Sequence, residues 1–194
     1  MNRKYIFLAI TIMSLFFISC EKKAVDPKAR KLNNKAIELM MDKNYDEALV
    51  ILDQALLIQK KYLIAYGNKL TIYLEVKDFN NALLVAEAIQ EIFPESAYGY
   101  FYKGMLLEKL GNIERSNETY KELVDLYKEI DFSNADFTVI ESYCIALKLA
   151  NMTEKLDQFT FMIIQNMLID EADIDYISNI KNNPRMEYFD SRLR

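Results

Sequence analysis

The chain of 194 residues contains no histidine and no tryptophan. Histidine is the side chain used most often as a general base and as a metal ligand. Its absence counts against a catalytic triad and a zinc site, and no other grouping of side chains suggests a catalytic centre. We therefore expect a protein that is not an enzyme and that binds no cofactor and no metal.

Glycine and proline are scarce, with 4 and 3 residues, whereas apolar residues make up 52% of the chain. Sheet proteins need many tight turns, and those turns depend on glycine and proline. The composition therefore favours an all-α protein whose helices are joined by short connections.

Basic side chains are outnumbered, with 24 Lys and Arg against 29 Asp and Glu. Proteins that bind nucleic acids usually carry a basic face for the phosphates. The net charge of −5 therefore predicts no nucleic-acid partner.

The first twenty residues read "MNRKYIFLAITIMSLFFISC", in which two basic residues precede an apolar run over 5–18. A helix that spans a membrane needs about 20 apolar residues, so this shorter run is typical of a cleaved secretion signal. An uncleaved N-terminal anchor is the alternative.

The run ends in "FISC", which resembles the lipobox of bacterial lipoproteins. The resemblance implies that residues 1–19 are a lipoprotein signal peptide and that Cys20 becomes a lipid-modified N-terminus. Glu21 after the cysteine then implies the outer membrane of a bacterial cell envelope, on either its periplasmic or its surface side. Residues 20–28 are polar and predict a tether. Cys144 is the other cysteine, so we expect no disulfide framework.

One short phrase recurs along the chain, as "KNYDEAL" at 43–49 and "KDFNNAL" at 77–83. Several columns of residues recur at this same interval of 34, among them Tyr45, Phe79 and Ile113, and the small residues Ala48, Ala82 and Ser116. A period of this length is typical of stacked helix–turn–helix pairs. Gly111, at the third turn, suits the left-handed conformation that ends a helix.

These columns resemble the tetratricopeptide repeat (TPR), with Tyr66 and Tyr100 at its fourth place, Gly104 at its eighth and Pro94 at its thirty-second. The resemblance implies an α-solenoid in which residues 29–170 form about four TPR-like repeats. Residues 171–194 then form a short C-terminal capping helix, with Asn183 as N-cap and Pro184 at its first position.

The fourth repeat is degenerate. "LKLANMTEKLDQF" at 147–159 matches "EKLGNIERSNETY" at 108–120, which aligns Ala150 with Gly111 at an offset of 39. This offset predicts an insertion of about five residues within 130–136, and either Ser133 or Asn134 is the predicted N-cap of the next helix.

The resemblance also implies a concave groove lined by the first helix of each pair. The groove is expected to be apolar and to bind a peptide or protein segment, because methionines adapt to varied apolar side chains. One alternative is that residues 171–194 fill the groove. The other is that the predicted groove residues belong to the core. The predicted groove residues are Ile37, Met40, Met41, Thr71, Leu74, Tyr98, Phe101, Met105, Ile140 and Cys144.

Lys35, Lys69 and Lys103 recur at the interval of the repeat. They could form a basic ladder for an acidic partner, or they could pack their stems on the helix pairs with the ammonium groups in water.

Together these features predict a non-catalytic protein-binding scaffold or assembly subunit, held in a bacterial envelope by a lipid. The alternative is a lipoprotein that captures glycan or peptide substrates for uptake, since some envelope glycan-binding lipoproteins use such repeats. The lack of tryptophan, a common platform for sugars, counts against the glycan version.

Overall fold

The computed structural model describes residues 24–166 and 168–182. The predicted signal peptide with Cys20, and the predicted helix start at Asn183 and Pro184, lie outside the described residues. In the described part, nine α-helices and one 3₁₀ helix follow one another. They are α2 (Pro27–Met41), α3 (Tyr45–Ile58), α4 (Leu63–Glu75), α5 (Phe79–Ile92), α6 (Ala97–Lys109), α7 (Ile113–Asp125), η1 (Phe132–Asn134), α8 (Phe137–Leu149), α9 (Thr153–Gln165) and α10 (Glu171–Asn182).

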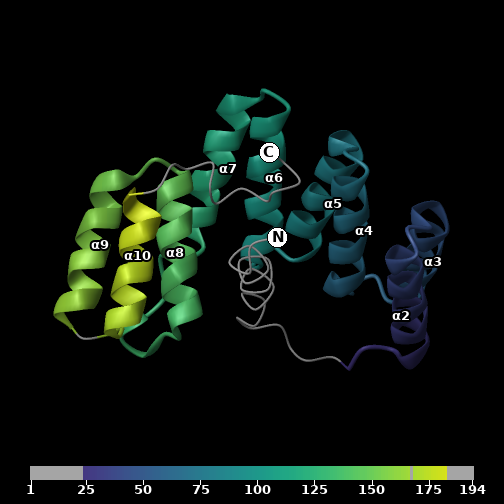
Figure 1. The fold of residues 1–194 in the computed structure, drawn as a ribbon, viewed down its shortest axis with the longest axis horizontal. Helices are drawn as coiled ribbons and strands as arrows, with labels where there is room; N and C mark the ends of the chain where they lie inside the picture. The colour runs from purple at the N-terminus through teal and green to yellow at the C-terminus, as the bar shows by residue number, and fades with distance from the viewer. Residues whose placement is uncertain (1–23, 167, 183–194) are drawn as a thin grey trace.

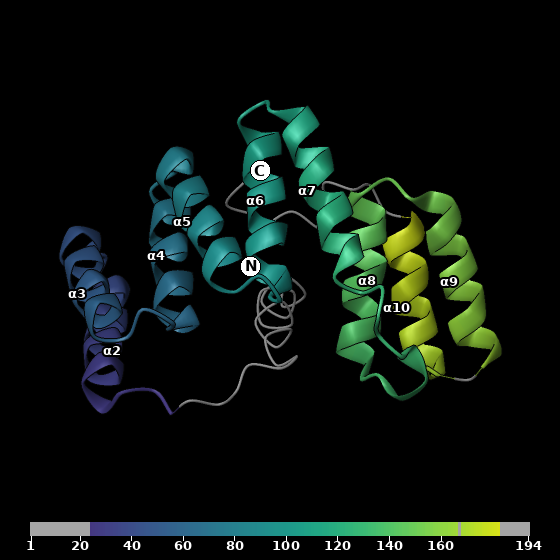
Figure 2. The same cartoon turned by 180° about the vertical axis from the view of Figure 1, so that it is seen from behind.

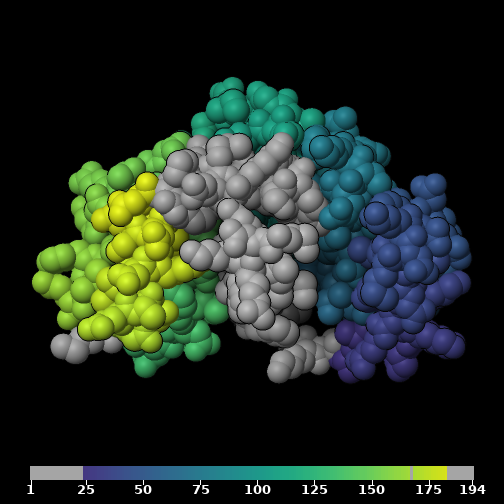
Figure 3. Space-filling view, in the orientation of Figure 1, coloured from purple at the N-terminus to yellow at the C-terminus, as the bar shows by residue number. Residues whose placement is uncertain are grey.

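The helices form antiparallel pairs that are stacked along an arch (Figure 1). The pairs are α2 with α3, α4 with α5, α6 with α7, and α8 with α9. At the two ends of the arch, α2 and α8 lie nearer its centre than α3 and α9 (Figure 2). In the space-filling view the pairs follow one another as bands in chain order (Figure 3). The predicted all-α solenoid is confirmed.

Helix α2 begins within the range expected to be a tether. The Asp26 carboxylate accepts hydrogen bonds from the backbone N–H groups of Lys28 (2.8 Å) and Ala29 (3.3 Å). Pro27 takes the first helical position, where its missing N–H costs nothing. Residues 27 and 28 are therefore helical.

The turn inside each pair has the same backbone conformation. In the first pair, the N–H of Lys43 donates to the carbonyl of Met40 (3.1 Å) and that of Asn44 to the carbonyl of Leu39 (2.8 Å). This is the Schellman arrangement, which requires a left-handed residue after the helix. Those residues are Lys43 (φ 60°), Lys77 (φ 58°), Gly111 (φ 81°) and Asn151 (φ 55°).

The left-handed residues correct the register of the fourth repeat. Asn151, not Ala150, is the equivalent of Gly111. The helix starts agree, since α6 and α7 begin at 97 and 113 whereas α8 and α9 begin at 137 and 153, an offset of 40 in both cases. The insertion is therefore one residue longer than the predicted five. The comparison of residue types aligned Asn151 with Asn112. In the structure Asn151 is instead equivalent to Gly111, because these two residues have the left-handed conformation that ends the helix.

The predicted N-cap of this repeat is wrong. Ser133 and Asn134 lie in η1, and the residue that precedes α8 is Asp136. The insertion is instead held by Phe132. Its ring stacks on Tyr143 at 5.1 Å between centroids and meets the edge of Phe159 at 4.7 Å. The inserted residues are thus tied to α8 and α9, the two helices of the pair that follows.

Small residues let neighbouring helices approach closely, as the repeat pattern predicts. A Cβ added at Gly104 would lie 2.4 Å from the ring of the buried Tyr120. The Ser116 hydroxyl donates to the Gly104 carbonyl at 2.9 Å. Between the second and third pairs, a Cβ added at Gly99 of α6 would lie 2.6 Å from the backbone nitrogen of Gln90 of α5. Larger residues at either glycine would force the helices apart.

Helix α10 continues the repeat rather than departing from it. It begins at 171, one interval of the repeat after the start of α8 at 137, and ahead of the predicted helix start at Asn183. The Tyr176 hydroxyl donates to the Glu141 carboxylate at 2.7 Å, just as the Asn68 amide donates to Asn33 at 2.8 Å. Both bonds join consecutive first helices with the same spacing along the chain. Helix α10 therefore takes the place of the first helix of a fifth pair.

The turn geometry makes a direct prediction about stability. Gly111→Ala should lower the free energy of unfolding by about 1 kcal/mol, because a left-handed conformation strains a residue that has a Cβ. No atom lies within 4 Å of the added Cβ, so the effect is one of the backbone alone. Lys77→Gly at the equivalent turn should raise the same free energy by up to about 1 kcal/mol. Urea unfolding followed by circular dichroism measures both changes.

Gly67→Ala serves as the control, because Gly67 lies inside α4 and an added Cβ would meet Tyr98 Oη at 3.5 Å, an ordinary contact. That variant should be at least as stable as the parent. A Gly111→Ala chain of parental stability would contradict the turn assignment.

Candidate protein-binding face

The ten predicted groove residues divide into two groups in the structure. Five are accessible: Ile37 and Met41 are exposed by 37% and 72%, and three others are half-buried. The half-buried residues are Met40, Thr71 and Tyr98. The other five are buried, namely Leu74, Phe101, Met105, Ile140 and Cys144.

The accessible group lies on the first helices of the first three pairs. Ile64, at the second place of α4, adds a side chain that is 59% exposed. We call this surface the N-terminal inner face; it consists of Ile37, Met40, Met41, Ile64, Thr71 and Tyr98. The ring of Tyr98 lies beside Gly67 of α4, whose lack of a side chain leaves room for it. On α2, α4 and α6 these six residues keep exposed or half-buried side chains, most of them apolar.

Leu74, Phe101 and Met105 belong to the main apolar core of the described residues. Phe101 packs edge-on against Tyr102, with ring centroids 5.6 Å apart. Leu74 and Met105 are therefore not open to a partner in this structure, and Phe101 keeps only 7% of its surface exposed. Helix α6 packs against both α5 and α7, so most of its surface is buried and it carries apolar side chains on most sides.

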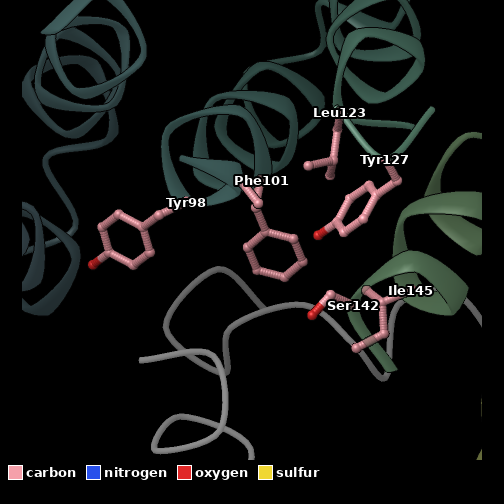
Figure 4. A pocket seen from close by; sticks show the side chains of 7 residues that line it. Tyr98, Phe101, Leu123, Tyr127, Ser142 and Ile145 are labelled. Atoms are coloured by element: carbon pink, nitrogen blue, oxygen red, sulfur yellow. The ribbon is translucent and has the colours of Figure 1, made fainter. Parts of the chain in front are cut away.

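A shallow apolar hollow lies where α6, the end of α7 and α8 meet (Figure 4). Its volume is about 20 Å³, which is room for about one water molecule. The hollow could hold part of one side chain of a partner. Its lining residues are Ala97, Tyr98, Phe101, Leu123, Tyr127, Ser142 and Ile145.

Ile140 and Cys144 owe their burial to the corrected register. With an offset of 40 they are equivalent to Tyr100 and Gly104, and Gly104 lies against Tyr120 of the second helix of its pair. One residue turns a helix by about 100°, so the same correction carries Glu141 and Ile145 to the groove-facing places. Burial also raises the pKa of the Cys144 thiol to about 12, which leaves the thiolate scarce. Cys144 thus acts as a small core residue.

The groove-facing side of the fourth pair is covered by α10. Glu141 is buried beneath Tyr176, and the Lys148 ammonium donates to the backbone carbonyl of Lys181. Ile177 and Ile180 of α10 are also buried. The described part of the capping segment therefore covers the inner side of α8, whereas the N-terminal inner face keeps exposed side chains. Coverage of the groove by residues 171–194 was one of the alternatives that the sequence left open, but the role of Glu141 was missed, because the shorter offset placed this residue outside the groove.

The recurring lysines join neighbouring helices. Lys35 lies 3.7 Å from Glu47, Lys69 forms an ion pair with Asp53, and Lys103 donates to the Gln90 amide at 2.7 Å. Each lysine therefore has a partner within the solenoid, which favours the packing interpretation over a basic ladder for an acidic partner.

Two further observations concern residues 24–166 and 168–182 only. Within these ranges, no group of three or more acidic or cysteine side chains is placed to hold a metal ion. Nor does any helix there combine the length and the apolar character that a bilayer crossing demands.

No model of a known protein family matches the sequence. Similar segments occur in several proteins. A FAM10 family protein of Arabidopsis thaliana is 37% identical over 77 residues, which cover 40% of this chain and 18% of that protein. The heat shock protein sti1 homolog of Schizosaccharomyces pombe is 30% identical over 94 residues, or 48% of this chain and 16% of that protein.

The human tetratricopeptide repeat protein 12 is 24% identical over 151 residues, which cover 73% of this chain and 20% of that protein. The chain thus spans about a fifth of the length of these relatives. The similarities agree with the regularly spaced helix pairs and the left-handed turns. The chain is thus similar to tetratricopeptide-repeat proteins in its sequence, and its stacked helix pairs are consistent with their fold.

The contact between α8 and α10 should depend on pH. Burial raises the pKa of Glu141 above its ordinary value of 4.5, and the hydrogen bond from Tyr176 opposes part of that rise. A raised pKa in the folded state gives stability while the carboxyl is protonated, and that stability is lost as pH rises through the folded-state pKa. Glu141→Gln, which stays uncharged and can still accept from Tyr176, should therefore be more stable than the parent near pH 7.

The gain should disappear as pH falls below 4.5, where the carboxyl is protonated in both states. Urea unfolding at several pH values measures it. The exposed Glu118 offers the control, since Glu118→Gln should follow the parent at every pH. A constant gain for Glu141→Gln across the pH range would contradict this account.

Proposed function

We propose that this chain is a non-catalytic scaffold or assembly subunit whose N-terminal inner face binds an apolar segment of another protein. The observation that carries the proposal is the exposure of Met41 (72%) and Ile64 (59%) on adjacent first helices. Several large apolar side chains exposed on one face of a protein are typical of an interaction site. The similarity to tetratricopeptide-repeat proteins supports the same class of function.

The geometry favours a partner segment that crosses α2 and α4. Met41 is the last residue of α2 and Ile64 is the second residue of α4, so the apolar surface runs obliquely over two helices that point the same way. Met40 and Met41 are unbranched and adaptable, which suits a partner side chain of varied shape. The partner would be an extended or helical segment with apolar side chains.

We also propose that the chain is anchored through Cys20 to a membrane of a bacterial cell envelope, most simply the outer membrane. The support is the run at 5–18 that ends in "FISC" and its resemblance to a lipobox. More than one acyl chain on Cys20 would make the anchoring stable. A partner would then be held at the membrane surface.

The binding site can be tested with charged substitutions. Met41→Glu and Ile64→Glu should each weaken binding of the partner about tenfold or more, since a carboxylate would have to be desolvated against apolar groups. Both side chains are exposed, so the fold should be retained. Affinity purification of the full chain from detergent-solubilised cells, with quantification of the copurified protein, measures the effect.

Val50→Glu and Leu84→Glu are matched controls, because these residues are 56% and 62% exposed on the second helices α3 and α5. They should leave the partner bound. If the two pairs of variants behave alike, the N-terminal inner face is not the binding site.

The lipid anchor has a separate test. Mass spectrometry of the chain purified from bacterial membranes should find its N-terminus at Cys20 with attached acyl chains. Cys20→Ser should abolish the acylation, whereas Cys144→Ser should leave it unchanged because Cys144 is buried in the fold. Recovery of a chain that still begins at residue 1 and carries no lipid would refute the anchor and leave the groove proposal untouched.

A further inference from the structure

The connections between pairs lie along one edge of the arch, the lower edge in Figure 1, and this edge is unevenly charged. At its N-terminal end, basic side chains are exposed where α2 begins and where the chain passes from α3 to α4. The chain as a whole is acidic, so this gathering of positive charge stands out. We call it the basic corner; it consists of Lys28, Arg30, Lys31, Lys60 and Lys61.

Hydrogen bonds hold the two segments of the basic corner together. The backbone N–H of Asp26 donates to the side-chain oxygen of Gln59 at 2.7 Å, and the Gln59 amide donates to the carbonyl of Lys61 at 3.2 Å. Burial raises the pKa of Tyr62, and the positive charge of Arg30 opposes part of that rise, which places Arg30 near the residue before α4. The start of α2 and the α3–α4 connection are therefore held side by side.

The basic corner contains little acidic charge of its own. Asp26 is the acidic residue within 24–31 and 59–62, and its carboxylate already accepts the backbone N–H groups of Lys28 and Ala29. In the part of the chain that the structure describes, none of the basic side chains of the corner forms an ion pair. Their charge is therefore available to an anionic partner.

The rest of this edge has the opposite sign. Among the described residues of the later connections, at 93–96, 126–136 and 166–170, Lys128 is the basic residue, and it is paired with Asp125 at 2.9 Å. An anionic surface would therefore attract the N-terminal end of the edge and repel its other end. The exposed acidic residues of these connections are Glu95, Glu129, Asp131, Asp136, Asp170 and Glu171.

The course of the chain indicates which anionic surface the corner would meet. The first described residue, Ala24, is two residues from Asp26 of the corner. Cys20, the proposed site of the lipid, precedes Ala24 by four residues, which span at most about 14 Å when extended. An anchor at Cys20 would thus keep the basic corner within reach of the lipid headgroups. The acidic end of a second copy has no such covalent link.

We propose that the basic corner docks on the anionic headgroups of the membrane that holds the chain, so that the first pair stands on the bilayer and the far end of the arch points away from it. This inference rests on the proposed membrane attachment and adds the orientation of the solenoid. Each basic side chain near an anionic bilayer favours docking roughly fivefold. Met41, at the end of α2, lies about 20 Å from the start of that helix, so it stays accessible to a partner.

Energy transfer from tryptophan to labelled lipids tests this orientation, because the chain itself contains no tryptophan. The full chain carries either Leu57→Trp, near the corner and 81% exposed, or Phe161→Trp, on α9 and 64% exposed. It is reconstituted into vesicles of phosphatidylcholine and phosphatidylglycerol with a dansyl-labelled headgroup. Transfer from residue 57 should exceed that from residue 161 at least about twofold, and high salt or pure phosphatidylcholine should reduce the difference.

Removal of positive charge gives matched variants of the Leu57→Trp chain. Four changes in the corner should lower the transfer to its value in pure phosphatidylcholine, because they weaken docking roughly a hundredfold or more. Four changes of exposed lysines elsewhere give the same net charge and should leave the transfer as it is. The corner changes are Lys28→Gln, Lys31→Gln, Lys60→Gln and Lys61→Gln, and the control changes are Lys43→Gln, Lys77→Gln, Lys121→Gln and Lys155→Gln.

Equal transfer from residues 57 and 161, or a loss that the control changes share, would overturn the docking of the basic corner. Dimers in detergent that the corner changes abolish would overturn it too, because the corner would then bind the acidic end of a second copy. These outcomes do not depend on acylation, since either a lipid on Cys20 or the apolar run at 5–18 holds the full chain on the vesicle. Mass spectrometry of the N-terminus decides separately whether Cys20 is acylated.

Discussion

The close approach of consecutive helices at small residues sets the geometry of this solenoid. Gly104 lies against Tyr120 within one pair, and Gly99 lies against the backbone of Gln90 between pairs. Neither place admits a Cβ without displacement of its neighbour. Because each pair meets only its neighbours, these contacts fix the relative position of successive pairs, and the arch follows from their repetition. The face available to a partner is a consequence of this packing.

The left-handed turns set the phase of the repeat along the chain. Four turns use the same pair of hydrogen bonds, although only Gly111 among them is the residue best suited to a positive φ. Lys43 and Lys77 therefore accept strain that the helix contacts outweigh. The register of the repeat decides which residues face the groove. With an offset of 39 in the fourth repeat the groove-facing residue would be Ile140, whereas with the observed offset of 40 it is Glu141. A carboxyl under α10 then stands where the sequence had suggested an open apolar site.

The period, the helical class and the columns of small residues could all be predicted from the sequence, because each results from local spacing. The exact length of the insertion does not follow from local spacing, because the inserted residues are held by contacts with distant side chains. Phe132, for example, packs its ring against Tyr143 and Phe159. The sequence also left two interpretations of Met105 open, as a groove residue or as a core residue, and it is buried. An apolar residue at a groove-facing place looks the same whether it meets a partner or the core, and α6 is apolar on nearly every side.

The division between open and covered parts of the inner face follows the division of the core. The described residues form two apolar cores, which share α4: Ala65 and Ile72 belong to the smaller, N-terminal one, and Leu70 and Leu74 to the larger. Helix α2 contributes only the small residues Ala29 and Ala36 to the smaller core, and Ile37 and Met41 stay exposed. The larger core takes in the inner-face side chains Leu74, Phe101 and Met105. One repeating unit can thus bury the inner side of some first helices and leave that of others accessible, according to which side chains the core takes in.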